Sequence, residues 1–426
     1  MFCRNESFRF VSGTFRLQCV ARFVLRIIYI LYFCIWKESL VLSHSFIKFD
    51  TMLKYNDMDY GCKVRYMRRA LELAANGAAY ASPNPMVGAV IVAPDGRVIG
   101  EGWHRRCGEG HAEVNAVASV AEADIPLLGK STMFVTLEPC SHYGKTPPCA
   151  RMIVERGIPH VVVAMADPNP KVSGRGIGIL RDAGIEVEVG LLAHEAYELN
   201  RRFLKSVTLR RPFITLKWAR SKDGYMDWIR SDEHPLPCRF STPLTTLSTM
   251  RLRALHDAVI TTAATVRADN PRLTLRNFDG KQPVAVVLTH SKQLPEDSFL
   301  AKKLLDGASD APLVYEFENP AALQEIFHDL YTRHGISSVL VEAGPTMLST
   351  LIDLRLWDDA REEIAPFALR GEGCHSAPVL PAACIHCEES VGDSVLRYYR
   401  SDGPACTLLS DSESTEKVCE KYKKNI

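Results

Sequence analysis

Short β-prone runs alternate with helix-patterned segments along most of this chain, and this alternation constrains the fold more than any other feature. It begins near Cys62, continues to about residue 189, and restarts after Arg210-Arg211-Pro212. Strands and helices that alternate over short links build layered α/β domains on a mixed or mostly parallel sheet. A chain of 426 residues is long enough to bury two cores of ordinary size. We therefore expect two α/β domains, over residues 58–206 and 207–400.

Hydrophobic periodicity and turn residues predict the individual elements. In the first domain we expect helices over residues 64–74, 111–121, 149–156 and 177–183, and strands over 87–92, 98–99, 133–137, 160–165 and 185–189. In the second domain we expect strands over residues 213–219, 257–262, 283–289 and 338–342, and helices over 247–256, 321–334 and from 345 onward.

Both ends of the chain fall outside this pattern. The apolar run 27–36 near the N-terminus is shorter than the ~20 residues that a bilayer span takes. The run could be the core of a secretory signal peptide, but no small-residue cleavage site follows it. A mitochondrial leader would be Arg-rich and acid-poor, which the segment fits only loosely. Because Met52 and Met58 directly precede the first well-patterned helix, we interpret residues 1–57 as an extension outside the fold, either upstream sequence or a targeting segment. Residues 401–426 are expected to form a polar tail, and the protein is expected to be cytoplasmic, with no membrane partner.

Charge and cysteine content limit the classes of partner. The formal net charge is +1, but residues 1–57 hold eight Lys/Arg against four Asp/Glu, which leaves 43 basic and 46 acidic residues in the remainder. Nucleic-acid-binding domains usually carry a basic stripe, so we expect no nucleic-acid partner.

Thirteen cysteines, an odd number spread over a long chain, do not suggest a disulfide framework. Without export, we expect these cysteines to be mostly reduced thiols or metal ligands.

Three short segments combine residues that suit a metal centre. His111-Ala112-Glu113 stands at an expected helix start, Glu138-Pro139-Cys140 follows an expected strand, and Pro147-Pro148-Cys149 begins the next helix. One imidazole and two thiolates are a soft donor set for Zn²⁺, and three protein ligands leave the fourth position for water. Zinc lowers the pKa of that water to about 7. Glu113 would then take the proton from the water and deliver it to a ring nitrogen and the departing ammonia.

Each segment alone is a weak signal, because isolated His-x-Glu pairs and buried cysteines are common. Their conjunction matches the zinc deaminase signature, except that the second Cys usually follows as Cys-x-x-Cys, and here it comes nine residues later. A structural zinc would need a fourth protein ligand and no acid–base partner, which Glu113 argues against. A nucleic-acid deaminase with the same zinc site remains an alternative, disfavoured by the acidic balance after residue 57.

These motifs resemble the bifunctional riboflavin-biosynthesis deaminase/reductase family, in which the widely spaced second Cys is usual. The likeness runs in order from about residue 60 to 400. In the first half it is carried by residues 82–90, 111–116, 138–149, 167–170 and 172–176. In the second half it is carried by residues 211–213, 216–217, 223–224, 252–254, 257–258, 265–266, 268–276 and 341–346.

The resemblance implies a cytidine-deaminase-like three-layer α/β/α domain followed by a dihydrofolate-reductase-like α/β domain. It also implies two reactions. The first deaminates 2,5-diamino-6-(5-phosphoribosylamino)pyrimidin-4-one, and the second reduces the ribosyl chain of the product to ribityl with NADPH. The implied partners are therefore one Zn²⁺, NADPH and a small phosphorylated pyrimidine, and the chain is expected to form a homo-oligomer through the reductase domain.

The resemblance also nominates binding residues that would otherwise pass as turn or surface residues. Asn84 would meet the pyrimidine edge, and Arg253 and Arg276 would grip the sugar phosphate, because guanidinium groups suit phosphate. Glu342 ends a strand before Gly344 and a helix, a setting where backbone N–H groups can receive a pyrophosphate. The full set for substrate is Asn84, Arg253, Leu273, Arg276 and Glu342, and the set for cofactor is Ala219, Thr265, Asp269 and Gly344.

Some features depart from the family or resemble other motifs. Many members carry a Ser and a Trp shortly before the segment matching Ser241-Thr242-Pro243, where this chain has residues 237–240, Pro-Cys-Arg-Phe. A deaminase with an impaired reductase domain is therefore a second alternative. Gly174-x-Gly176-x-Gly178 lacks dinucleotide-loop spacing, and we interpret it as a turn and helix start. Cys384-Ile-His-Cys387 has no second ligand pair and is interpreted as a coincidence.

Overall fold

The computed structural model describes residues 58–141, 147–168, 173–291 and 293–402. The expectations for residues 1–57 and for most of the polar tail lie outside these described residues. The described residues from Val64 onward form one compact unit. Within the described part of the chain, none of the helices has the length and apolar character that a membrane span requires.

The first half of the compact unit is built on a five-stranded mixed sheet, in the order β2-β1-β3-β4-β5. β1 is antiparallel to both β2 and β3, whereas β3, β4 and β5 run parallel. The strands are β1 (Gly88–Val92), β2 (Val98–Trp103), β3 (Thr132–Val135), β4 (His160–Val163) and β5 (Glu186–Val189). The helices are α3 (Tyr60–Ala75), α4 (Ala112–Ala118), α5 (Cys149–Glu155) and α6 (Arg175–Asp182), with a 3₁₀ segment η1 (Glu122–Lys130) before β3.

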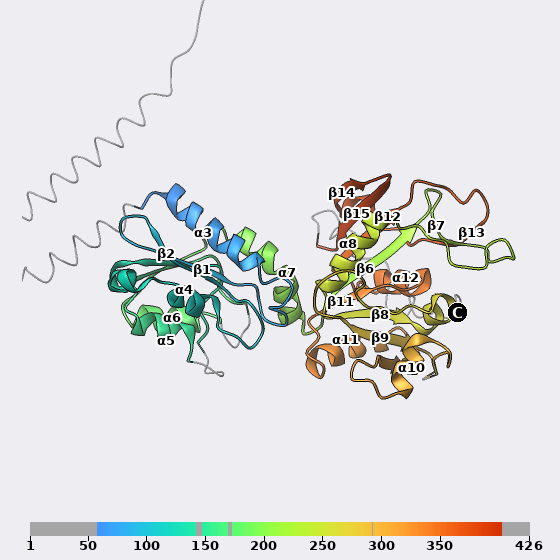
Figure 1. Cartoon of the computed structure of the whole chain (residues 1–426), viewed down its shortest axis with the longest axis horizontal. Coiled ribbons are helices and arrows are strands. Elements are labelled where there is room, and N and C mark those ends of the chain that lie inside the picture. Colours follow the sequence, from blue (N-terminus) through green and yellow to red (C-terminus); the bar gives the residue numbers. More distant parts are fainter. Residues whose placement is uncertain (1–57, 142–146, 169–172, 292, 403–426) are drawn as a thin grey trace, which may run out of the picture. The chain divides into compact units, whose positions relative to one another are not determined.

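Glycines allow helices to pack closely on both faces of this sheet (Figure 1). A Cβ on Gly88 of β1 would lie 2.0 Å from the Ala70 carbonyl oxygen of α3, and one on Gly102 of β2 would lie 2.2 Å from the Ala116 amide of α4. Alternate residues of a strand face opposite sides, and Ile91 of β1 belongs to the core beneath α4, α5 and α6. The three-layer α/β/α arrangement expected for this domain is therefore confirmed.

An eight-stranded sheet forms the second half, in the order β10-β9-β8-β11-β6-β12-β15-β14. The six strands from β10 to β12 run parallel, and β15 and β14 close the edge antiparallel. The strands are β6 (Phe213–Arg220), β8 (Ala258–Thr262), β9 (Val284–Thr289), β10 (Leu313–Glu316), β11 (Ser338–Val341), β12 (Asp359–Ile364), β14 (Ile385–Val391) and β15 (Ser394–Arg400). This is the dihydrofolate-reductase-like α/β domain expected from the sequence.

Five helices and a small two-stranded sheet complete the described part of this domain. The helices are α8 (Pro243–Ala254), α9 (Ala263–Asp269), α10 (Phe299–Leu305), α11 (Ala322–Thr332) and α12 (Pro345–Asp353). β7 (Tyr225–Trp228) pairs with β13 (Gly373–Ser376), and a short 3₁₀ turn, η2 (Ala382–Cys384), precedes β14. The α11 and α12 side of the sheet holds the main core, where Trp218, Phe327 and Leu348 are buried.

Helix α7 (Ala193–Leu209) joins the two halves and was not expected from the sequence. Its buried face includes Asn200 and Arg201, which interrupt the apolar repeat that would have revealed it. Asn200 exchanges two hydrogen bonds with the Met86 backbone, both 2.8 Å, and Arg201 lies 2.5 Å from an Asp359 oxygen. The predicted boundary between residues 206 and 207 falls inside α7, and the domain limits stay predictions.

Candidate metal centre and reductase pocket

The three predicted metal ligands converge in the structure. His111 is the N-cap of α4, Cys140 follows β3, and Cys149 is the first residue of α5. His111 Nδ1 lies 3.5 Å from Cys140 Sγ and 3.4 Å from Cys149 Sγ, and the three ligand atoms lie within 4.8 Å of one another. Tetrahedral zinc with ordinary bond lengths would separate such a nitrogen and sulfur by about 3.6 Å. The donor set and its spacing therefore fit Zn²⁺, and among the described residues no other such group was found.

Glu113 lies in the first turn of α4, two residues after the ligand His111, and only 3% of it is exposed. Burial, and after it the neighbouring Cys140, raises the pKa of Glu113 to about 7. A carboxyl group with a pKa near neutrality can both accept and release a proton at working pH. This burial and raised pKa are the properties that a general acid–base group needs, and the catalytic role of Glu113 stays a prediction.

Asn84 is linked to the same site through His104, which belongs to none of the sequence motifs. Its side-chain nitrogen lies 3.1 Å from His104 Nε2, and His104 Nδ1 lies 3.2 Å from the Gly110 carbonyl oxygen. The His104 ring stands edge-on to His111, with ring centroids 5.3 Å apart. Burial lowers the pKa of His104, which favours its neutral form. In the sequence, His104 is a single histidine after a strand, and nothing there indicates that it lies beside Asn84 and His111.

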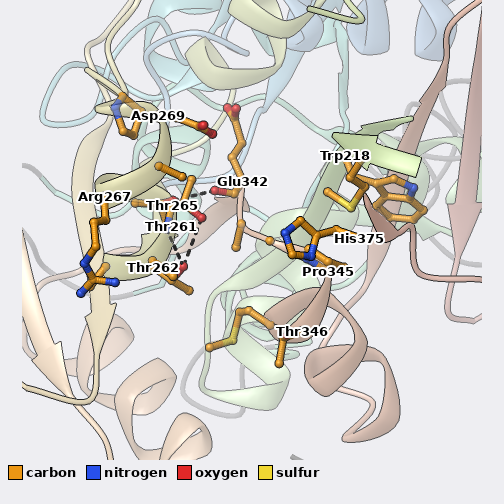
Figure 2. Close-up of a pocket in the computed structure, with 18 of the residues that line it drawn as sticks. Trp218, Thr261, Thr262, Thr265, Arg267, Asp269, Glu342, Pro345, Thr346 and His375 are labelled. Carbon is orange, nitrogen blue, oxygen red and sulfur yellow. Dashed lines mark hydrogen bonds between the residues drawn. The ribbon is translucent and has the colours of Figure 1, made fainter. Parts of the chain in front are cut away.

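The second domain has a cavity of about 950 Å³ at the carboxyl ends of its parallel strands (Figure 2). Its wall comes from residues that follow or end β6, β8, β9 and β11, and from β7 and β13. Parallel α/β sheets place ligands at this edge because loops and helix N-termini meet there. The walls include most of the nominated residues: Ala219, Arg253, Thr265, Asp269, Leu273, Glu342 and Gly344. Arg276, the remaining reductase nominee, is exposed and does not line the cavity.

Arg253, Glu342 and Lys217 bring three charges together in this cavity. Arg253 Nε and Nη2 donate to the two Glu342 carboxylate oxygens at 2.6 and 3.0 Å, and Nη1 donates to the Thr274 carbonyl oxygen. Although burial opposes it, Arg253 holds the pKa of Glu342 down, at about 2. Burial lowers the pKa of Lys217, and Glu342 counteracts this. In the sequence, Lys217 contributes to the family resemblance but not to the predicted binding residues. A lysine inside a strand does not reveal which cavity it faces.

The cofactor nominees line the cavity from three elements, β6, α9 and the start of α12. Thr265 is in the first turn of α9, where its backbone N–H donates to the Thr262 hydroxyl oxygen at 3.3 Å. Asp269 ends that helix, and burial raises its pKa. Gly344 is the N-cap of α12, and no side chain caps this helix end, so the backbone N–H groups of Thr346 and Met347 border the cavity. Figure 2 shows Thr265, Asp269 and Arg267 on one side and Thr346 on the other.

The departure at residues 237–240 places an aromatic ring in the cavity wall. Phe240 lines the cavity and stacks on Phe367 at a centroid distance of 5.8 Å. The Cys238 backbone N–H donates to Asp227, another lining residue, at 2.7 Å. The segment therefore still closes this side of the cavity.

The described residues include both look-alike motifs, and the structure supports the interpretation of the glycine run. Gly174 has a φ of 75° and is the N-cap of α6, so the glycine run is a turn and helix start. Cys387 is exposed while Cys384 is buried, and the interpretation of this motif as a coincidence stays a prediction.

Comparison with known proteins agrees with both halves. Residues 61–165 match the cytidine and deoxycytidylate deaminase zinc-binding region, and residues 212–377 match the RibD C-terminal domain. The RibD riboflavin biosynthesis protein of Bacillus amyloliquefaciens is 36% identical over 327 residues, covering 72% of this chain and 85% of that protein. The Escherichia coli K12 protein of the same name is 36% identical over 343 residues, covering 74% and 90%.

Solved structures extend the similarity to the whole fold. RibD of Acinetobacter baumannii superposes with a TM-score of 0.71 at 32% identity, covering 80% of this chain and 99% of that chain. A Thermotoga maritima diaminohydroxyphosphoribosylaminopyrimidine deaminase/5-amino-6-(5-phosphoribosylamino)uracil reductase superposes with a TM-score of 0.68 at 34% identity, with the same coverage.

Fold and site together define a bifunctional enzyme, a deaminase of the zinc-binding class joined to a dihydrofolate-reductase-like reductase. The chain belongs to the RibD family, and its role is in riboflavin biosynthesis.

Proposed function

We propose that this enzyme converts 2,5-diamino-6-(5-phosphoribosylamino)pyrimidin-4-one to 5-amino-6-(5-phosphoribosylamino)uracil and then reduces the ribosyl chain to ribityl. The observation that carries the first step is the convergence of His111, Cys140 and Cys149 beside a buried Glu113. These three residues would hold Zn²⁺. When bound, the metal lowers the pKa of a water molecule so that it can attack the amino-bearing carbon at neutral pH.

Glu113 would act as the general base and then the general acid of this hydrolysis. It takes a proton from the attacking water, gives one to the neighbouring ring nitrogen, and passes one to the amino group, which leaves as ammonia. Asn84 would orient the pyrimidine through its amide, which His104 holds in place. The pKa of Glu113, about 7, suits a group that must accept and release protons in one turnover.

The cavity of the second domain would bind the product and NADPH. When bound, NADPH would supply a hydride for C1′ of the sugar. The bond from C1′ to the ring oxygen would break, and that oxygen would need a proton. Lys217, which lines the cavity, would give this proton, because the charge of Glu342 counteracts the lowering of its pKa by burial. Thr265, Asp269, Ala219 and the N-terminus of α12 at Gly344 would bind the cofactor, while Arg253, Leu273 and Glu342 would contact the substrate. Arg276 would reach the sugar phosphate from outside the cavity wall.

A two-part assay tests the proposal. The purified full chain with zinc should release ammonia from the diaminopyrimidine substrate, and with NADPH it should oxidise the cofactor when given the deaminated intermediate directly. Unchanged NADPH in that second assay would refute the reductase half and favour a chain with an impaired reductase domain. Ammonia release from single-stranded DNA or RNA, but not from the pyrimidine, would refute the deaminase half.

Two further expectations concern the whole protein. A homo-oligomer through the reductase domain can be tested by sedimentation of the full chain and of a reductase-only fragment. The cytoplasmic location can be tested by fractionation of cells that express the complete sequence. Both stay predictions.

A further inference from the structure

The Glu138 carboxylate, two residues before the ligand Cys140, is surrounded by backbone donors. Its Oε1 accepts hydrogen bonds from the amides of Gly176 and Ile177 at 2.8 and 3.3 Å. Its Oε2 accepts hydrogen bonds from the amides of Asp167 and Gly174 at 3.0 to 3.2 Å. Only 5% of Glu138 is exposed. The carboxylate therefore binds the N-terminus of α6 and the loop before it, 29 to 39 residues away in sequence.

The segment that carries Glu138 is held from two sides. On one side, the Pro139 carbonyl oxygen would lie 1.9 Å from a Cβ on Gly176, so α6 rests directly against this backbone. On the other side, the Ala150 amide donates to the Cys140 carbonyl oxygen at 3.2 Å, and the Cys149 amide donates to Cys140 Sγ, also at 3.2 Å. The position of Cys140 is thus set between α6, through Glu138, and α5, which carries the third ligand.

We propose that Glu138 is a positioning residue for the metal centre, which holds Cys140 at the correct distance from His111 and Cys149. This inference rests on the proposed zinc site. Glu138 touches neither metal nor substrate. It acts through the backbone, in the way that groups behind metal ligands commonly orient them.

The chemistry of the four donors requires a carboxylate. Each oxygen receives two N–H groups, so an amide side chain would point its NH₂ group at two donors whichever way it is turned. Leaving buried donors unpaired is costly, and the chain would move to relieve it. The negative charge also favours the N-terminus of α6, where free N–H groups gather.

The test compares Glu138→Gln with the wild-type full chain. Loss of partners behind a metal ligand typically weakens metal binding by about 10–100-fold, and we expect a loss of zinc affinity in this range. With Co²⁺ in place of zinc, the sulfur-to-metal charge-transfer and d–d absorption bands should shift, because they report the arrangement of the two thiolates. NADPH oxidation with the deaminated intermediate should stay unchanged, which shows that the reductase domain is folded.

Glu101→Gln is the matched control in the same domain. Glu101 is a partly buried carboxylate that accepts two hydrogen bonds from Arg69, at 2.8 and 2.9 Å, and is remote from the ligand segment in sequence. This variant should keep wild-type zinc affinity and cobalt bands. If Glu138→Gln also keeps them, the positioning role is wrong. If the wild-type chain itself binds no zinc, the proposed metal centre fails, which is a different result.

A measurement on the wild-type chain covers the case in which Glu138→Gln does not fold. If Glu138 couples α6 to the ligand segment, zinc binding should slow hydrogen exchange of the Gly174, Gly176 and Ile177 amides. Amides of α11 in the other domain serve as the reference and should not respond. Equal exchange of the three α6 amides with and without zinc would overturn the proposal.

Discussion

The guanidinium of Arg253 and the carboxylate of Glu342 form a two-point ion pair, 2.6 and 3.0 Å long, inside the cavity of the reductase domain. Arg253 comes from α8 and Glu342 follows β11, so the pair joins a helix to the carboxyl end of a central strand. Both residues were nominated as substrate contacts, and in the structure they contact each other. Each charge is therefore compensated while it remains in the cavity.

Glu342→Gln is expected to lower the kcat/KM of the reductase by about 100-fold or more, in the range typical of lost acid–base groups. The change leaves Arg253 without its anion and removes the charge that supports protonated Lys217. NADPH oxidation with the deaminated intermediate measures the effect, and ammonia release by the same sample should be unchanged. A variant that reduces the intermediate at the wild-type rate would contradict the role given to Glu342.

Glu113→Gln should lower deamination by about 10²–10⁴-fold, because the amide cannot carry protons between water, ring and leaving group. Zinc content, measured on the same sample, should remain one per chain, since Glu113 is not needed as a ligand. Wild-type ammonia release by this variant would rule out the proposed proton transfers.

Removal of the metal should separate the two activities. Dialysis against a chelator is expected to abolish ammonia release and leave NADPH oxidation with the supplied intermediate intact, because His111, Cys140 and Cys149 all lie in the first domain. Added Zn²⁺ should restore deamination. Loss of both activities on chelation, with no change in folding, would contradict this separation.

Gly88→Ala should destabilise the first domain by about 1–3 kcal/mol, because the new Cβ would lie 2.0 Å from the Ala70 carbonyl oxygen. Neither atom belongs to a flexible side chain, so the clash can be relieved only by movement of the backbone. Gly178→Ala is the control, since that position in α6 has no atom within 4 Å of an added Cβ. There, alanine should stabilise by about 0.5–1 kcal/mol. Chemical denaturation followed by circular dichroism measures both, and equal stabilities of the two variants would refute the packing argument.

Because of His256, the free energy of unfolding should decrease as the pH falls below 6.5. Burial, aided by nearby Arg202, lowers the pKa of this histidine from 6.5 to about 3, and its ring nitrogens lie 2.7 Å from the Leu252 carbonyl oxygen and 2.8 Å from the Thr215 hydroxyl. The folded pKa is below the unfolded one, so this contribution is complete above pH 6.5 and is lost as the pH falls toward 3. The slope should approach about 1.4 kcal/mol per pH unit. His256→Asn should flatten the free energy of unfolding between pH 6.5 and 5, and an equally steep variant would exclude His256 as the cause.

The metal centre was accessible to prediction because its signals are local. His111, Cys140 and Cys149 each stand at the end of a strand or the start of a helix, and their residue types alone suit zinc. Glu138 gave no comparable signal, since its partners are backbone amides that any residue could supply. Lys217 also gave no signal of its surroundings. Its place in a strand predicts burial, but the sequence does not show that Glu342 is its neighbour.

The alternation of elements predicted most of the parallel core, and the misses have physical causes. Every residue of β14 from Ile385 to Ser390 is exposed, so this edge strand has no apolar alternation to detect. Helix α7 hides its period behind buried Asn200 and Arg201, which are satisfied by hydrogen bonds that only the folded chain provides.

Helix α7 has a practical consequence for separating the two activities. A cut at residue 206 would sever the helix near its last turn, and the upstream fragment would keep Arg201 while the downstream fragment kept Asp359 and Asp402. Each fragment would then expose part of a charge cluster that the intact chain neutralises. A reductase fragment that begins before Ala193 retains these partners, and it is therefore the one to express.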